Sequence, residues 1–141
     1  MILGVGTDLI DIRRIERTMA RFGERFLDRV FTATEQRQAR GRASPTAAFA
    51  QRYAAKEACA KALGTGFRQG VFWKDISVDN WPSGQPFLSL TGGAARRLAM
   101  LVPERRMARI DLSLTDEPPY GHALVVISAD TAEEHALRPS Y

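Results

Sequence analysis

Two carboxylates and two lysines are the residues in this chain whose types and spacing suggest chemistry. Asp8 follows two glycines in the segment GVGTDL, and Glu57 lies between Lys56 and Lys61 in the segment RYAAKEACAKALGTG, residues 52–66. Magnesium is typically held by one or two carboxylates together with substrate phosphates and waters, and fixed cations stabilise phosphate charge. If the fold brings the two segments together, they would form a metal–pyrophosphate site.

The second segment falls within a helix that we predict from Ser44-Pro45 to Gly64. At about 100° per residue, Lys56 lies in the middle of an apolar stripe, whereas Glu57 and Lys61 share the adjacent face. A lysine centred in such a stripe usually needs an anionic partner. The many alanines lack bulk, so another backbone or a ligand can come close. The stripe consists of Phe49, Ala60 and Leu63.

Each of these features also has an ordinary structural interpretation. Glu57 and Lys61 have the i, i+4 spacing of a solvated helix ion pair, which contributes only about 0.2–0.5 kcal/mol. The loop Gly64-Thr65-Gly66 could be a plain helix stop, or it could present backbone N–H groups to a phosphate. The spacing alone does not choose between these interpretations.

The N-terminal segment alternates as a strand does, from about Ile2 to Leu9. Gly4, Gly6 and Asp8 then project from one face, and two glycines on one face indicate a close approach by another group. Taken alone, Asp8 is typical of a turn at a strand end. The segment lacks the third glycine of a dinucleotide fingerprint, and no Gly-Lys-Ser/Thr follows it, so it is not a P-loop either.

The order of the predicted elements indicates an α+β fold. Adjacent strands are mostly joined by hairpins, so we expect a mainly antiparallel sheet with one long helix packed against it, in a single domain over residues 1–141. Helical spacing begins near Ile15 and continues to Phe26, with Gly23 expected to break or bend the helix. Thr32 or Thr34 before Glu35 is a capping signal. Further strands are expected over residues 71–80, 85–92, 106–116 and 121–130, and a short helix over 92–102.

The charge of the chain favours an anionic partner. The net charge is +4 and the pI about 9.7. A nucleic-acid-binding module would explain this charge, but it explains neither Asp8 and Glu57 nor the Gly-Thr-Gly loop, and aromatic residues are not interleaved with basic ones. We therefore expect no nucleic-acid partner. A non-catalytic scaffold is a third alternative, and it would bind ligand without turnover.

Composition also bears on location. No apolar run approaches the roughly 18 residues of a membrane-spanning helix, so no membrane partner is expected. Acidic residues close behind the apolar start are unlike a secretory leader. Cys59 is the single cysteine, which excludes an internal disulfide and is compatible with a cytoplasmic location.

The two motifs together identify a family. The chain resembles the holo-[acyl-carrier-protein] synthases, the small bacterial 4′-phosphopantetheinyl transferases, in GVGTDLIDIRRIE near the N-terminus and in RYAAKEACAKALGTG. The resemblance extends to SLTDEPPYGHALVVIS and so covers nearly the whole chain. Either motif alone would be a weak signal, but their order and spacing together are highly specific.

The resemblance implies transfer of the phosphopantetheine arm of coenzyme A to a serine of apo acyl carrier protein, in support of fatty acid biosynthesis. It makes Asp8 and Glu57 the magnesium ligands, and it implies a homotrimer with active sites at the subunit boundaries. Glu57 is the nearest candidate to accept the serine proton, directly or through a metal-bound water. The expected catalytic residues are Glu57, Lys56 and Lys61, and the expected cofactor-binding residues are Arg52, Lys56, Lys61, Gly64, Thr65, Gly66, Asp111 and Ser113.

One position departs from the family pattern. Many members carry histidine where this chain has Asp111, so an essential histidine is not expected there. On an alternating strand Asp111 and Ser113 face the same way, and that polar face can still line the pocket.

The arginines of the first predicted helix are candidates for partner docking. Arg14, Arg17, Arg21 and Arg25 lie on one face if the helix runs that far, and a solvated basic face is the ordinary interpretation. The resemblance implies that acidic carrier proteins dock there through Arg14, Arg21 and Arg25.

Overall fold

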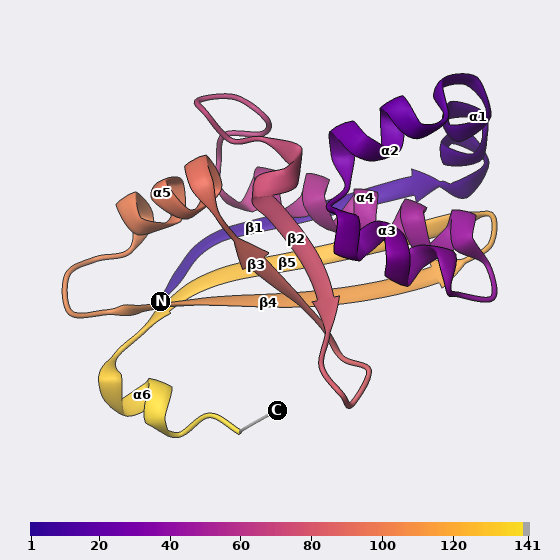
Figure 1. Ribbon diagram of the computed structural model, residues 1–141. Coiled ribbons are helices and arrows are strands. Elements are labelled where there is room, and N and C mark those ends of the chain that lie inside the picture. The colour runs from indigo at the N-terminus through magenta and orange to yellow at the C-terminus, as the bar shows by residue number, and fades with distance from the viewer. Residues whose placement is uncertain (140–141) are drawn as a thin grey trace.

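A three-stranded antiparallel sheet runs the length of the molecule (Figure 1). The structure is a computed structural model, and it describes residues 1–139. Strand β5 (Tyr120–Asp130) lies in the centre, between β1 (Ile2–Asp11) and β4 (Met107–Glu117). The α+β fold and the mainly antiparallel sheet are therefore confirmed.

One long helix, α4 (Pro45–Ala62), covers one face of this sheet. The strand side chains on the covered face are buried, with Ala123, Val125 and Ile127 fully excluded from solvent. Alanines of α4, such as Ala54 and Ala58, pack against this face and are also fully buried. Small side chains on both elements let helix and sheet approach closely.

The glycines of β1 mark the closest part of this contact. A Cβ atom added to Gly6 would lie 1.8 Å from the carbonyl oxygen of Ala58, and one added to Gly4 would lie 1.9 Å from that of Ala62. The group that approaches the glycine face is thus the backbone of α4. The same register brings Asp8, on the same strand face, beside the helix.

Three short helices follow β1 and surround the start of α4 (Figure 1). Helix α1 (Ile12–Phe22) begins at Asp11, whose side chain accepts a hydrogen bond from the backbone of Arg13. Gly23, with φ of 55°, separates α1 from α2 (Glu24–Val30), which confirms the predicted break. Helix α3 (Ala33–Arg40) begins at Thr32 with a reciprocal capping box to Glu35.

The segment after α4 forms a second, smaller unit of secondary structure. Strands β2 (Ile76–Asn80) and β3 (Pro86–Leu90) make the predicted hairpin, and α5 (Gly92–Leu101) follows. The strand expected from residue 71 was wrong at its start, because Trp73–Asp75 forms a 3₁₀ turn, η1. The Trp73 ring stacks on Phe67 at 3.7 Å between centroids, and this contact folds the segment back over α4.

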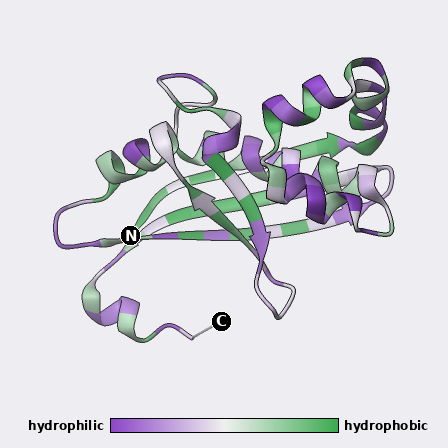
Figure 2. Cartoon of the chain, in the orientation of Figure 1, coloured by the Kyte–Doolittle hydropathy of each residue, from purple (hydrophilic) through white to green (hydrophobic). Residues whose placement is uncertain are grey.

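The other face of the sheet carries exposed apolar side chains. Leu9 is 68% exposed and Val5 56%, and Leu124 on β5 is also exposed. Figure 2 shows the hydrophobic stretches that run along β1 and β5. Helix α6 (Ala132–Ala136) follows β5 at the far end of the sheet. None of the helices within residues 1–139 is long and apolar enough to cross a membrane.

The contact between β1 and α4 gives the first prediction. Gly6→Ala should lower the free energy of unfolding by about 1–3 kcal/mol or more, because the new methyl group would collide with a backbone carbonyl that cannot turn away. Chemical denaturation measures the change. Gly41→Ala is the matched control, since Gly41 has an ordinary φ of −80° and its added Cβ would meet nothing closer than 3.6 Å. Equal stability of the two variants would contradict the close contact.

Candidate active site

Asp8 and Glu57 come together where β1 passes α4. The Asp8 carboxylate accepts a hydrogen bond from the Lys61 ammonium at 3.2 Å, and the same ammonium donates to the carbonyl oxygen of Thr7 at 2.9 Å. Asp8 is mostly shielded from solvent, whereas half of the Lys61 side chain is exposed. The predicted grouping of Asp8, Glu57 and Lys61 is therefore present in a single chain.

Glu57 sits in an environment that disfavours its charge. Partial burial raises the pKa of the Glu57 carboxyl above its usual range, and the negative charge of Asp8 raises it further. Lys61, a hydrogen bond from the Tyr53 hydroxyl and the charge of Arg14 act in the opposite direction. Two mutually repelling carboxylates with one mobile ammonium between them are suited to a bound cation.

The donor set fits magnesium in the way the sequence predicts. Within residues 1–139 there is no group of three or more His, Cys, Asp or Glu side chains that could enclose a metal ion. Magnesium does not require such a cage, because it is commonly held by one or two carboxylates while substrate phosphates and waters complete its shell. Asp8 and Glu57 would provide those two carboxylates, and they would relieve their repulsion by sharing the cation.

Lys56 lies elsewhere than the resemblance implies. Its side chain is 0% exposed, and its ammonium donates to Glu35 at 2.7 Å, to the Val30 carbonyl at 2.8 Å and to the Trp73 carbonyl at 3.1 Å. A lysine ammonium has three N–H donors, so none is left for a phosphate. The expectation of a catalytic and cofactor-binding Lys56 is thus corrected: its anionic partner is a protein carboxylate.

Arg52 is also separated from the two carboxylates. It is buried, it donates to the Ala48 carbonyl at 3.2 Å, and the acidic groups that act on it are Glu35 and Asp79. Burial lowers the pKa of its guanidinium. Arg52 therefore points toward α3 and β2, not toward Asp8 and Glu57.

The Gly64-Thr65-Gly66 loop behaves as a helix stop. Gly64 and Gly66 have φ of 79° and 58°, and their backbone amides donate to the carbonyls of Lys61 and Ala60. The Thr65 hydroxyl donates to the Gly66 carbonyl. Both glycine amides therefore donate to carbonyls at the end of α4. These two N–H groups are not available to a phosphate, as one of the two interpretations of the loop required.

Asp111 and Ser113 lie on the opposite face of the sheet from Asp8. Asp111 pairs with Val126 and Ser113 with Leu124, whereas Asp8 pairs with Ala123, and paired residues share a face. The sheet itself therefore separates both side chains from the Asp8 carboxylate. The predicted role of Asp111 and Ser113 in cofactor binding therefore stays a prediction, and it requires a site other than the Asp8 side of their own sheet.

The predicted docking arginines lie on two helices. Arg14 and Arg21 belong to α1, but the break at Gly23 places Arg25 in α2, so the single arginine stripe was wrong in this respect. A groove of about 320 Å³ lies between the two helices. Arg14 acts electrostatically on Glu57, which connects α1 to the carboxylate site. The groove is lined by Thr18, Phe22, Arg25, Phe26 and Arg29.

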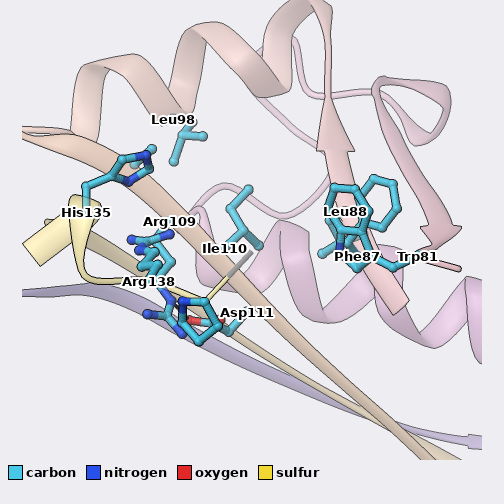
Figure 3. Close-up of a pocket in the computed structure, with 11 residues that line it drawn as sticks. Trp81, Phe87, Leu88, Leu98, Arg109, Ile110, Asp111, His135 and Arg138 are labelled. Carbon is cyan, nitrogen blue, oxygen red and sulfur yellow. Dashed lines mark hydrogen bonds and ion pairs between the residues drawn. The ribbon is translucent and has the colours of Figure 1, made fainter. Parts of the chain in front are cut away.

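A second pocket, of about 500 Å³, lies beside the edge strand β4 (Figure 3). Figure 3 shows Arg109 and Asp111 from β4 and Arg138 from the C-terminal segment on one side of it, and Trp81 with Phe87 from the hairpin on the other. None of Asp8, Glu57 and Lys61 lines it. This pocket is therefore separate from the carboxylate site.

The sequence analysis missed two contributors to the site. Tyr53 was not singled out, although it is one turn before Glu57 and hydrogen-bonds to it. Glu35 was recognised only as a cap, although one of its oxygens accepts from Lys56 and the other from the backbone of Val78 at 3.0 Å. The i, i+4 spacing could have revealed Tyr53, but no local pattern connects Glu35 to a residue 21 positions away.

Cys59 is excluded as a nucleophile. It is fully buried, and burial raises the pKa of its thiol to about 12. Its role is that of a small hydrophobic side chain in the core.

Comparison with known proteins gives the site its context. Residues 4–113 match the model of the 4′-phosphopantetheinyl transferase superfamily. The chain belongs to the 4′-phosphopantetheinyl transferase superfamily. A holo-[acyl-carrier-protein] synthase of Beijerinckia indica is 60% identical over 139 residues, which is 99% of either chain. Another, from a Methylobacterium strain, is 61% identical over 129 residues, covering 92% of this chain and 96% of the relative.

Solved phosphopantetheinyl transferase structures share the fold. The crystal structure of holo-[acyl-carrier-protein] synthase from Neisseria meningitidis superposes with a TM-score of 0.81 at 34% identity, over 91% of this chain and 99% of that one. The Helicobacter pylori synthase, solved in complex with coenzyme A, gives 0.75 at 26% identity, over 88% and 99% of the two chains. Asp8, Glu57 and Lys61 of this transferase lie within residues 4–113, the range that matches the superfamily model.

The carboxylate cluster gives the second prediction. Asp8→Asn and Glu57→Gln should each lower kcat/KM by about 100-fold or more, because an amide of similar shape cannot replace a charge that neutralises a cation. Steady-state rates over a magnesium titration measure the loss. The control is Glu16→Gln, which removes an exposed carboxylate of α1. Wild-type rates for both site variants at saturating magnesium would refute the assignment.

Proposed function

We propose that this chain transfers 4′-phosphopantetheine from coenzyme A to a serine hydroxyl of an apo acyl carrier protein, in support of fatty acid biosynthesis. The observation that supports this most is the Asp8–Glu57–Lys61 cluster, in a chain that is 60% identical along 99% of its length to a holo-[acyl-carrier-protein] synthase. The single buried thiol, Cys59, is compatible with a cytoplasmic location.

The reaction breaks the pyrophosphate bond of coenzyme A and forms one phosphate ester bond to serine. The serine oxygen bonds to the phosphorus that carries pantetheine, and the bond from that phosphorus to the bridging oxygen breaks. Adenosine 3′,5′-bisphosphate leaves with the bridging oxygen, and the serine proton passes to a base. Such transfers depend mostly on positioning and on neutralising charge.

The chain's own residues divide these tasks. Glu57 is the proposed proton acceptor, since its raised pKa makes it a stronger base than a solvated carboxylate. Lys61 can turn its exposed ammonium from Asp8 toward the leaving phosphate. Magnesium, when held by Asp8 and Glu57, would neutralise the pyrophosphate.

We further propose that the active unit is a homotrimer with the sites at its subunit boundaries. The uncovered sheet face, with exposed Val5, Leu9 and Leu124, is the apolar surface that such an assembly would bury. Asp111 and Ser113 lie on that face, so only in an assembly could they reach a neighbouring copy's cofactor. Arg52, whose buried Nε has no hydrogen-bond partner within the described residues, is likewise a candidate for a cofactor held between copies.

The direct test is mass spectrometry of an apo acyl carrier protein after incubation with the enzyme, magnesium and coenzyme A. The expected result is a gain of one phosphopantetheine group on the carrier, together with release of adenosine 3′,5′-bisphosphate. Tight binding of coenzyme A with no mass change on the carrier would instead support a non-catalytic scaffold.

The exposed arginines of α1 give the third prediction. Arg21→Glu should raise KM for the acidic carrier about tenfold and leave KM for coenzyme A nearly unchanged, because Arg21 lies outside the carboxylate site. The wild-type kcat/KM for the carrier should fall as salt rises above about 0.1 M, and the variant should respond less. Arg37→Glu, an exposed arginine of α3, is the control. Equal effects on both substrates would mean that this face is only solvated surface.

The uncovered sheet face gives the fourth prediction. Leu9→Glu or Leu124→Glu should convert a trimer into monomers in light scattering and should remove most activity, since a charge cannot be buried in the apolar contact. Leu137→Glu is the control, because Leu137 is 85% exposed but lies outside the sheet. A fully active wild-type monomer would contradict the shared-site model.

A further inference from the structure

A buried ion pair lies next to the carboxylate site, and the proposed reaction makes no use of it. The side chains of Lys56 and Glu35 are both 0% exposed, and their Nζ and Oε1 atoms are 2.7 Å apart. Both residue types are almost never fully buried unless they are paired. A buried pair is also weak support for stability, because apolar replacements are often neutral or stabilising.

The pair joins five separate segments of the chain. Lys56 extends from α4 to the carbonyl of Val30 at the end of α2 and to that of Trp73 in η1. Glu35 accepts from the backbone of Thr32, at 2.9 Å, through Oε1 and from the backbone of Val78 in β2 through Oε2. Every donor of the ammonium is used, so the geometry around it is fixed by several partners at once.

One of these segments, η1, carries Trp73, whose ring packs on Tyr53 of α4; these two rings are called the Trp73–Tyr53 wall below. The Trp73 ring stacks on Tyr53 at 4.8 Å between centroids and on Phe67 at 3.7 Å. Tyr53 lies one helical turn before Glu57 on α4, and its hydroxyl acts on the pKa of the Glu57 carboxyl. The Lys56 ammonium thus holds the backbone of Trp73, Trp73 packs on Tyr53, and Tyr53 lies one turn from the carboxylate that follows Lys56 in the sequence.

We propose that Lys56 and Glu35 are positioning residues, which hold the Trp73–Tyr53 wall against Glu57 and so fix the direction of its carboxylate. This inference rests on the proposed transfer reaction. Its specific consequence is a loss of turnover that far exceeds any loss of coenzyme A affinity, because the contacts end at Glu57, the proposed proton acceptor, and leave Asp8 and Lys61 in place.

The test replaces the ion pair by a neutral pair of similar size. Glu35→Gln combined with Lys56→Met leaves no unpaired buried charge, so the double variant should melt at a higher temperature than Lys56→Met alone. We expect its kcat to fall by about 10- to 100-fold, because displacing a reacting group by about 1 Å has an effect of this size. The KM for coenzyme A should change by less than about threefold. The control is Glu24→Gln with Arg40→Met, which removes an exposed ion pair and should change neither quantity.

A readout independent of activity follows the wall directly. The chain has two tryptophans, so in a Trp81→Phe background the emission reports on Trp73 alone. The double variant should shift this emission and the control should not. If the double variant does not fold, the Trp73→Leu variant is used in the rate measurement. This substitution removes the ring contact with Tyr53, while the backbone carbonyl at position 73 still accepts from Lys56. The same loss of kcat with unchanged KM for coenzyme A is expected.

Wild-type kcat in a folded double variant, or in Trp73→Leu, would overturn the positioning role, and so would unchanged Trp73 emission. These outcomes differ from failure of the proposed function, which would appear as an inactive wild-type enzyme. An active wild type with unaffected variants would leave the transfer reaction standing and would assign the ion pair to folding alone.

Discussion

The close contact between the backbone of α4 and the glycine face of β1 is the constraint on which the site depends. Two glycines on the strand and a series of alanines on the helix bring the backbones close enough that any Cβ at Gly4 or Gly6 would collide with a helix carbonyl. Because Asp8 follows on the same strand face, this contact places one carboxylate beside Glu57 on the helix. The burial of Glu57 and its repulsion by Asp8, which both raise the pKa of the Glu57 carboxyl, are therefore consequences of packing between small residues.

The cations of α4 show how one helix serves both the core and a solvent-facing site. Lys61 keeps half of its side chain in solvent and reaches Asp8, whereas Lys56, five residues earlier, is enclosed by Glu35 and two carbonyls. An exposed ammonium can exchange a carboxylate for a phosphate at little cost, but a buried one cannot give up its partners without leaving charges unpaired. Burial thus makes one lysine of the motif a solvent-facing partner of Asp8 and encloses the other in the core.

The two faces of the sheet have different tasks. One face is closed by α4 and carries Asp8, and the other presents Val5, Leu9 and Leu124 to solvent beside the polar side chains of β4. An exposed apolar strand face next to polar residues of the expected cofactor set is what a subunit boundary would use. The proposed trimer would bury this face, and light scattering can test whether it forms.

The sequence alone determined the fold class, an interruption of the first helix at Gly23 and a cap at Thr32 or Thr34, because alternation, capping and helix-breaking signals act within short stretches. It named Asp8 and Glu57 as a candidate pair, but only the packing of β1 on α4 brought them together. It also indicated that Lys56 needed an anion. Only the tertiary structure decided that this anion is Glu35, that Arg52 points away from the site, and that Asp111 and Ser113 lie behind the sheet. Those outcomes depend on which distant segments of the chain come into contact and on which face of a strand is covered. Local periodicity in the sequence specifies neither of these.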